Sequence, residues 1–455
     1  MAREIIQVEQ RPPVGRGIAL SLQHLFAMFG ASVLVPMIFG VNVSVVLLMN
    51  GVGTLLYILI TKGKAPAFLG SSFAFLAPVG AILASNPGGY AEALGGFVLV
   101  GVIFMIVAGI IKLFGIKWID IVMPPAAMGA VIALIGLELA GTAVQANGHG
   151  IVATATAPID ARNVLVFLVT LGIAVFGSVL FRKFFAVIPI LTAIVGGYVT
   201  AVLVDAFWPL TGTMQKLLDF SDFNKIHDFG SLFAVPSFTT PVFKLAPMLT
   251  ILPAAIVVIS EHIGHQLVTG KIVDRDLIKK PGLHRTLFAD GLSTTLSGFV
   301  GAVPTTTYGE NIGVMAITRV YSVWVIGGAA VISILMCFIA PIAYFIGSIP
   351  WAVIGGVSFL LYGMIAASGV RLFVESKVDY SKSRNLVLTS VTLITGLSGV
   401  GIPLRLPGST DSYTLTGMAL ASIVAMLLSL IFYFAEKLKI TNDDPDEAPA
   451  EPESE

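Results

Sequence analysis

The chain has 455 residues, of which 56% are hydrophobic and only 11% are charged, and its formal net charge is zero. Because soluble proteins carry about 25% charged residues, this composition excludes an ordinary soluble protein, and nothing in it favours a nucleic-acid partner. The single cysteine, Cys337, excludes a disulfide framework.

Apolar runs recur along the chain, and a membrane-spanning helix needs about 20 such residues. The first run follows a charged stretch with no obvious cleavage site, which predicts a retained helix rather than a signal peptide. Seven spans are expected in the first half, near residues 17–36, 43–61, 66–84, 93–112, 123–140, 163–181 and 185–204. Seven more are expected near residues 246–265, 286–302, 305–318, 321–345, 350–369, 386–402 and 414–436. The sequence therefore predicts an all-α polytopic membrane protein with 14 transmembrane segments.

Fourteen spans place both termini on one side of the membrane, and the basic residues indicate which side. Of the 26 lysines and arginines, only five would then lie on the other side: Arg162, Lys216, Lys225, Lys244 and Arg405. The positive-inside rule predicts this bias for cytoplasmic termini. The stretch 205–245 would then be an extracytoplasmic loop, and the acidic segment 441–455 is predicted to be a disordered tail.

The two halves of the chain contain similar segments. NGVGTLL at 50–56 resembles DGLSTTL at 290–296, and each leads into a short, polar, β-prone run: SSFAF at 71–75 and PTTTY at 304–308. The segment from Pro124 likewise resembles the segment from Ile349. With seven spans in each half, the halves would enter the membrane from opposite sides, as inverted repeats do in transporters.

The two β-prone runs are expected to form a short antiparallel ladder at membrane depth, because extended backbone there must be paired or face a cavity. Each strand would lead into a half-helix whose first N–H groups are free to bind a ligand. The alternative is that both runs are ordinary helix kinks.

Ionisable side chains inside spans are costly and usually face a partner or a cavity. Six are found: His24, Glu138, Glu261, His262, His265 and Glu310. Glu261 and His265 are four residues apart on one helix face, so they form a candidate proton-coupling pair, or alternatively a structural network at a helix end. His262 is expected to point away, toward the membrane interface. Glu310 would begin a half-helix, either as an acceptor for a ligand or as a cap, and Glu138 is assigned a structural or gating role.

A metal site and an enzyme active site are both disfavoured. His262 and His265 are three residues apart, unlike the H-E-x-x-H pattern of zinc enzymes, and no cluster of further ligands accompanies them. No catalytic triad or phosphate-binding loop is found. We therefore predict no metal, no cofactor and no enzymatic activity.

Two motifs resemble a known family. GENIGVMAITR at 309–319 fits the signature of nucleobase–ascorbate transporters through Glu310, Asn311, Gly313, Thr318 and Arg319. LQHLFAMFG at 22–30 matches the first-helix motif of that family through Gln23 and His24. With SEHIGH at 260–265, the chain is most similar to the proton-coupled uracil permeases of bacteria within the family. The resemblance extends from Val8 to Lys439.

The resemblance implies a fold of seven plus seven inverted spans, divided into a core domain and a gate domain. The N-terminus would be 1–16, the core 17–118 and 246–345, and the gate 119–204 and 346–440. It also implies a homodimer in the bacterial inner membrane, with both termini cytoplasmic and the lipid bilayer around it.

The resemblance also implies the substrate contacts. Glu261 and Glu310 would accept hydrogen bonds from the N–H groups of uracil, and the backbone amides of Phe73 and Gly309 would donate to its carbonyls. His265 would partner Glu261. Tyr308 would line the site, and Tyr362 would approach from the gate. Two carboxylates and two free amides are complementary to the two N–H donors and two carbonyl acceptors of uracil.

The predicted function is import of uracil coupled to protons, by movement of the core against the gate. One alternative is a permease of the same fold for xanthine or another nucleobase. Another is a facilitator that equilibrates its substrate without using a proton gradient.

Overall fold

The computed structural model describes residues 5–441 except 87, 154–157, 210–214 and 406–411. The predicted acidic tail therefore lies outside the described residues from 442 onward. The first half is largely helical, with one short strand between its second and third helices. Its main elements are α1 (Val14–Phe39), α2 (Val43–Ile60), β1 (Leu69–Ser71), α3 (Leu76–Ser85), α4 (Tyr90–Phe114), α5 (Lys117–Val122), α6 (Pro125–Gln145), α7 (Ala161–Leu180) and α8 (Pro189–Phe207).

The second half has the same succession of a strand between helices, and then adds a β-hairpin. Its elements are α9 (Leu245–Ile251), α10 (Ala254–Val273), α11 (Leu283–Val300), β2 (Thr305–Thr307), α12 (Gly309–Thr318), α13 (Val323–Met336), α14 (Ala340–Gly347), α15 (Trp351–Glu375), α16 (Ser383–Leu397), β3 (Gly401–Arg405), β4 (Ser412–Thr416) and α17 (Gly417–Lys437). In the part of the chain that the structure describes, nine helical segments are long and apolar enough to cross a membrane.

Apart from the two predicted spans that contain β1 and β2, three predicted spans are not single helices. The span predicted at 321–345 is divided into α13 and α14, because Pro341 at the start of α14 cannot continue an earlier helix. The span predicted at 246–265 is divided into α9 and α10, and Pro253 lies at the break. The span predicted at 386–402 ends at Leu397, and the chain then enters the β3–β4 hairpin, where no strands were expected.

The predicted ladder between the two short strands is confirmed. β1 pairs antiparallel with β2, with Leu69 opposite Thr307, Gly70 opposite Thr306 and Ser71 opposite Thr305. The first strand lies earlier than predicted and shares only Ser71 with the run 71–75, because the chain then turns into a 3₁₀ helix (Phe73–Phe75) that leads into α3. Phe73 therefore begins a helical turn and is not part of the strand.

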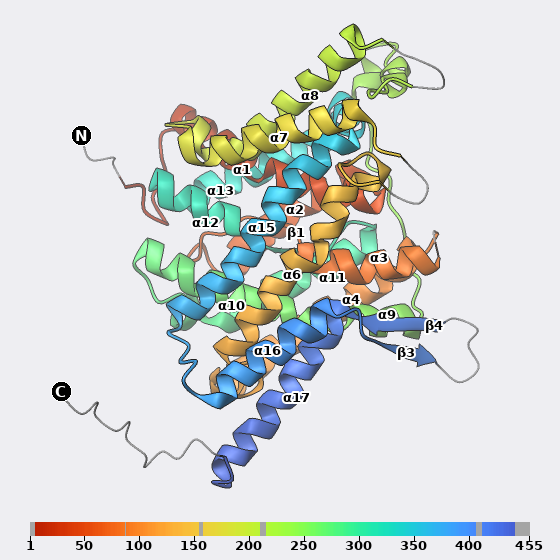
Figure 1. Ribbon diagram of the computed structural model, residues 1–455. Coiled ribbons are helices and arrows are strands. Elements are labelled where there is room, and N and C mark those ends of the chain that lie inside the picture. The colour runs from red at the N-terminus through yellow and green to blue at the C-terminus, as the bar shows by residue number, and fades with distance from the viewer. Residues whose placement is uncertain (1–4, 87, 154–157, 210–214, 406–411, 442–455) are drawn as a thin grey trace, which may run out of the picture.

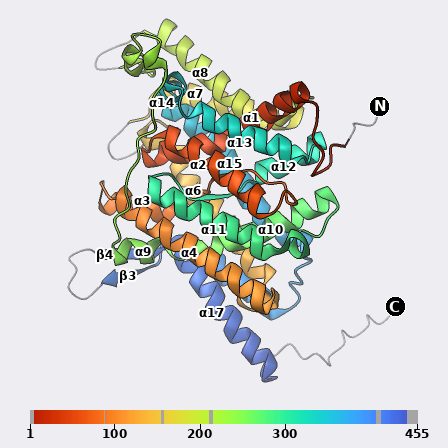
Figure 2. The ribbon, with the colours of Figure 1, turned by 180° about the vertical axis from the view of Figure 1, so that it is seen from behind.

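Helices from the two halves pack against one another in a pattern that repeats. α4 packs on α11 as α13 packs on α2, and α6 packs on α16 as α15 packs on α7. Figure 1 shows α6 and α7 beside α15 and α16, and Figure 2 shows, from behind, α2 and α4 beside α11 and α13. The start of α1 and the end of α17 lie on one side, here called the terminal side. The β3–β4 hairpin lies on the opposite side, here called the hairpin side (Figure 1).

Two extended segments run across these two sides. On the terminal side, the backbone of Ile6 bonds with Arg319 and Tyr321, and Glu9 forms a two-bond ion pair with Arg275 at 2.5 and 2.7 Å. On the hairpin side, the segment after α8 hydrogen-bonds through its backbone to the ends of other elements, at Phe338, Val300 and Ala91. These segments join the ends of helices that are distant in sequence.

Candidate ligand-binding site at the paired strands

Each strand of the β1–β2 pair leads directly into a short helix, and this arrangement creates the candidate site. The helical turn after β1 begins at Phe73, and α12 begins at Gly309. Because the first N–H groups of a helix have no partner within the helix, these two residues present free backbone donors. The N–H of Tyr308, just before α12, donates to the carbonyl of Phe68 at 3.1 Å and so aligns the two helix starts.

Side chains from α11 hold β2 in place. Thr305 donates to the hydroxyl of Ser293 at 2.6 Å, and its carbonyl accepts from Thr294 at 2.8 Å. The hydroxyl of Thr306 lies 3.5 Å from the carboxylate of Asp290. All five side chains are buried. The run of three threonines therefore supplies both β propensity and a set of anchoring hydroxyls.

α10 brings a carboxylate and an imidazole to the end of β2. The Nδ1 atom of His265 lies 3.1 Å from the hydroxyl of Thr307. A Cβ atom on Gly309 would lie 3.4 Å from Nε2 of His265, an ordinary van der Waals distance, so the two residues are direct neighbours. Glu261 lies one turn earlier on α10, which packs against α12, the helix that carries Glu310. The structure thus gathers four of the predicted site residues, and gives His265 a hydrogen bond with Thr307.

The site residues on α10 and α12 are not sealed from solvent. Glu261, His265 and Glu310 are half-buried, and Gly309 is exposed, although they belong to elements in the middle of the helix bundle. Their neighbour Tyr308 is buried, and its ring lies against Gly70 of β1. Polar groups that stay accessible inside a membrane protein usually face a ligand or a water-filled path.

Tyr362 approaches the site from another helix group. Its ring meets that of Phe73 edge to face, with 6.2 Å between centroids and 81° between planes. Its helix, α15, packs backbone to backbone against α6, where a Cβ on Gly136 would lie 2.0 Å from the carbonyl oxygen of Tyr362. Aromatic pairs in this geometry stabilise contacts beyond the area that they bury. Phe73 and Tyr362 therefore form one wall beside the first helical turn.

The motif residues have distinct positions. His24 of α1 is buried, and its Nδ1 atom lies 3.1 Å from the side-chain oxygen of Asn311, so the two motifs are in direct contact. Thr318 ends α12 and accepts a hydrogen bond from the N–H of Val320, and Arg319 has a left-handed backbone conformation (φ 58°) that stops the helix. Gln23 is half-buried and lines a hollow on the terminal side.

That hollow has a volume of about 490 Å³ and separates two groups of elements. One wall comes from α1 and the end of α12, and the other from the α7–α8 connection. It is lined by Arg16, Leu20, Gln23, Lys183, Phe184, Val187, Thr318 and Val320. A volume of this size lies in the range of small-molecule sites.

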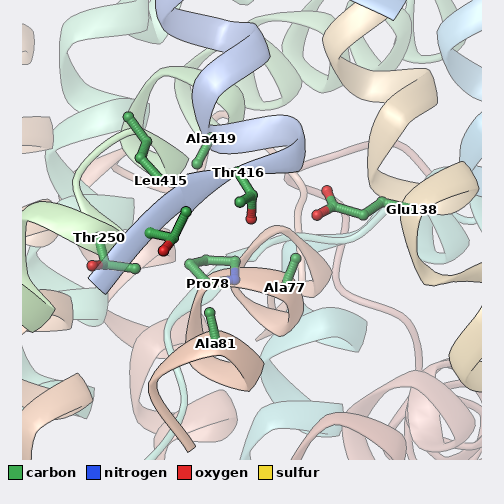
Figure 3. A pocket seen from close by; sticks show the side chains of 9 residues that line it. Ala77, Pro78, Ala81, Glu138, Thr250, Leu415, Thr416 and Ala419 are labelled. Atoms are coloured by element: carbon green, nitrogen blue, oxygen red, sulfur yellow. The ribbon is translucent and has the colours of Figure 1, made fainter. Parts of the chain in front are cut away.

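The hairpin side has a much smaller cavity between the same two groups. A cavity of about 20 Å³, room for about one water molecule, separates α3 and α9 from β4, α17 and α6 (Figure 3). Glu138 lines it and accepts a hydrogen bond from the N–H of Met418 at 2.9 Å. Glu138 therefore caps the start of α17, which agrees with the structural role predicted for it.

The expectation for His262 is wrong. It does not face the membrane interface but is completely buried, with its Nδ1 atom 2.9 Å from Oδ2 of Asp290. Asp290 was missed among the ionisable residues inside spans, although it begins the repeated segment DGLSTTL. The signal was its alignment with Asn50, which places an acid inside α11. Among the described residues, no group of three or more potential metal ligands is present.

Comparison with known proteins adds independent information. A family model described as "Permease family" matches residues 15–404. The uracil permease of Escherichia coli strain K12 is 51% identical over 448 residues, which cover 96% of this chain and 96% of that protein. The uracil permease of Paenibacillus larvae is 48% identical over 447 residues, with 97% and 100% covered. The uracil permease of Bacillus caldolyticus is 46% identical over 435 residues, with 95% of each covered.

Solved structures show the same fold at low sequence identity. The transmembrane domain of the cyanobacterial bicarbonate transporter BicA aligns with a TM-score of 0.61 and 14% identity, covering 94% of this chain and 99% of that one. Murine Slc26a9, an anion transporter in its inward-facing state, aligns with a TM-score of 0.69 and 11% identity, covering 94% and 69%. From its sequence and its fold, the chain belongs to the permease family of nucleobase–ascorbate transporters and is a membrane transporter, not an enzyme.

Proposed function

We propose that the protein is a secondary active transporter that imports uracil together with protons. The observation that carries this proposal is that α10, the helix of Glu261, packs against both helix starts, the turn at Phe73 and α12 with Gly309 and Glu310. Carboxylates accept hydrogen bonds and free backbone amides donate them. This set is complementary to the edge of uracil, and the names of the three permeases reported above agree with it.

Each site residue has a proposed role. Glu261 and Glu310 accept from the ring N–H groups, and the amides of Phe73 and Gly309 donate to the ring carbonyls. The side chains of Tyr308 and of Tyr362 line the site from the two helix groups. A site of this kind rejects a ring that leaves its buried polar groups unpaired.

Glu261 and His265 are the proposed proton-coupling pair. They lie one turn apart on α10, so a proton on either group affects the charge that the other can carry. His265 also contacts Thr307 of β2 at 3.1 Å, which connects the pair to the strand that holds the substrate. Protonation and substrate loading are thereby linked, since a ligand shifts a conformational equilibrium only through differential binding.

Transport is proposed to proceed by movement of a core domain against a gate domain. The core comprises 17–118 and 246–345, and the gate 119–204 and 346–440. Fourteen spans are obtained if five shorter or more polar helical elements, α3, α11, α12, α13 and α16, also cross the membrane. If the termini are cytoplasmic, the hollow of about 490 Å³ opens inward and the tight packing around Glu138 closes the outside. The proposed setting is a bacterial inner membrane, with a homodimer as the assembly.

Uptake of labelled uracil into proteoliposomes with an imposed inward proton gradient tests this function. Accumulation above equilibrium that a protonophore abolishes is the expected result. Glu310→Ala should abolish binding, whereas His265→Ala should reduce proton-driven uptake at least as much as binding. Uptake that only equilibrates would contradict proton coupling and favour a facilitator. Absence of uracil uptake, with uptake of xanthine, would contradict the substrate.

A further inference from the structure

A second pair of ionisable residues lies beside the proposed substrate site and takes no part in it. His262 of α10 and Asp290 of α11 are both completely buried, with 2.9 Å between Nδ1 and Oδ2. Asp290 also faces β2 through Thr306, at 3.5 Å. Within the described residues, both ring nitrogens of His262 and Oδ1 of Asp290 lack a hydrogen bond of acceptable geometry, so the pair is defined by its ion-pair distance alone. Burying polar groups without hydrogen bonds costs free energy, so their presence here calls for a functional explanation.

The other half of the chain shows that packing does not require this acid. α1 and α2 contact β1 as α10 and α11 contact β2. In the matching segments, Gln23 and His24 correspond to Glu261 and His262, and Asn50 corresponds to Asp290. Asn50 is as deeply buried as Asp290.

The difference between the halves is therefore one of charge and not of size. Glutamine and glutamate have nearly the same shape, as do asparagine and aspartate, but only the acids gain and lose protons. The N-terminal half carries the amide at both positions, and the C-terminal half carries the acid at both. A role in packing alone does not explain why both positions carry an amide in the N-terminal half and an acid in the C-terminal half.

The ionisable neighbours of the pair are the groups of the proposed transport site. On α10, Glu261 directly precedes His262 and His265 follows it one turn later. The buried Tyr57 lies on α2, which packs on α11, and Glu310 lies on α12, which packs on α10. The other helices packed on α10 carry their charged groups near their ends: Glu92 and Lys112 on α4, Glu138 toward the end of α6, and Glu436 and Lys437 on α17.

We propose that His262 and Asp290 form a second proton-holding pair, which acts on the substrate site through the charge of Glu261. This inference rests on the proposed proton-coupled function. With a proton on the imidazole, the pair is an ion pair with no net charge. When that proton leaves, an unbalanced carboxylate remains beside Glu261, and two like charges in a buried site disfavour each other. Loss of the proton from the pair therefore favours a proton on Glu261.

Asp290→Asn tests this proposal, because it gives the C-terminal half the residue that the N-terminal half already has. Three properties are measured: uracil exchange across proteoliposomes at equal pH, accumulation driven by a proton gradient, and the Kd for uracil in detergent as a function of pH. The variant should exchange uracil nearly as well as the unmodified protein. Its proton-driven accumulation should fall about tenfold or more, and its Kd should depend less on pH, since one coupled proton site changes affinity about tenfold per pH unit.

Thr306→Val is the matched control, because it removes the contact between Asp290 and β2 without removing a titratable group. It should leave the pH dependence of the Kd in place. If both variants lose exchange and binding equally, the pair is structural and the proposal is overturned. Unchanged accumulation and an unchanged pH profile in Asp290→Asn would also overturn it.

Two further outcomes separate this proposal from the proposed function. If the unmodified protein exchanges uracil but does not accumulate it, proton coupling fails and this inference fails with it. If the unmodified protein accumulates uracil and Asp290→Asn does so equally well, only this inference fails. Should Asp290→Asn not fold, His262→Gln is measured instead and judged by the same criteria.

Discussion

The two strand–helix units that meet at the centre of the protein share a backbone plan but differ in chemistry. The first unit, β1 with the turn at Phe73, carries no ionisable side chain and contacts the other unit through Gly70 and the ring of Tyr308. The second, β2 with α12, carries Glu310 and is contacted by His265. The comparison shows that the two units share the same backbone geometry, whereas only the second unit carries an acidic side chain. Amide donors come from both units, and charged acceptors gather around the second.

The largest expected effect comes from removing the charge of the second unit. In Glu310→Gln the side chain keeps its size, but it loses a charged hydrogen-bond acceptor, which contributes about 1.5–3 kcal/mol in a buried setting. Uracil affinity should therefore fall by roughly 10- to 150-fold, as measured by calorimetry in detergent. Glu138→Gln, at the cap of α17, is the control and should bind uracil normally. A loss of less than about threefold in Glu310→Gln would place the charge outside the site.

The close contact between the two units can be broken at Gly70. A Cβ atom there would lie 2.3 Å from the ring of Tyr308, and both residues are buried. Gly70→Ala should therefore displace Tyr308 and destabilise the protein by about 1–3 kcal/mol, the usual cost of overpacking. The measurement is thermal unfolding in detergent, with and without uracil. Gly80→Ala, on α3 where a Cβ meets no atom within 4 Å, is the control and should unfold at the original temperature or slightly above it.

A smaller effect is expected where the second unit meets α10. Thr307→Val removes the hydroxyl that lies 3.1 Å from Nδ1 of His265. A neutral hydrogen bond contributes about 1 kcal/mol, so proton-driven uptake should fall by about fivefold while the fold is kept. Thr305→Val removes a comparable bond to Ser293 on the same strand, away from His265. If both variants reduce uptake equally, the contact with His265 has no special role.

The sequence predicted the paired strands because two similar segments occurred at matching places in both halves, each polar and β-prone. It predicted Glu261, His265 and Glu310 because ionisable residues inside apolar runs are few. It did not predict the burial of His262, because spacing along a helix tells which residues share a face and not which neighbour that face meets. The β3–β4 hairpin was missed for a related reason. GIPLR and SYTLT are short and lie beside long apolar runs, so hydropathy alone could not separate them from the helices.

The smallest effect concerns the terminal side, where Glu9 and Arg275 join the N-terminal segment to the end of α10. The Arg275 guanidinium donates to the Glu9 carboxylate and holds the pKa of that carboxyl below its ordinary value. A lowered folded-state pKa means that the pair stabilises the protein above the unfolded pKa, and that this stabilisation is lost as the pH falls through the folded pKa. The side chain of Glu9 is 54% exposed, so solvent screening limits the contribution of the ion pair to stability to about 0.2–1 kcal/mol.

Glu9→Gln should therefore lower the unfolding temperature slightly at neutral pH and leave it unchanged at acidic pH, where the carboxyl of the unmodified protein is itself protonated. High salt should also remove the difference. A variant that unfolds earlier by the same amount at every pH and salt concentration would show that the N-terminal segment is held by its backbone bonds to Arg319 and Tyr321 and not by this charge.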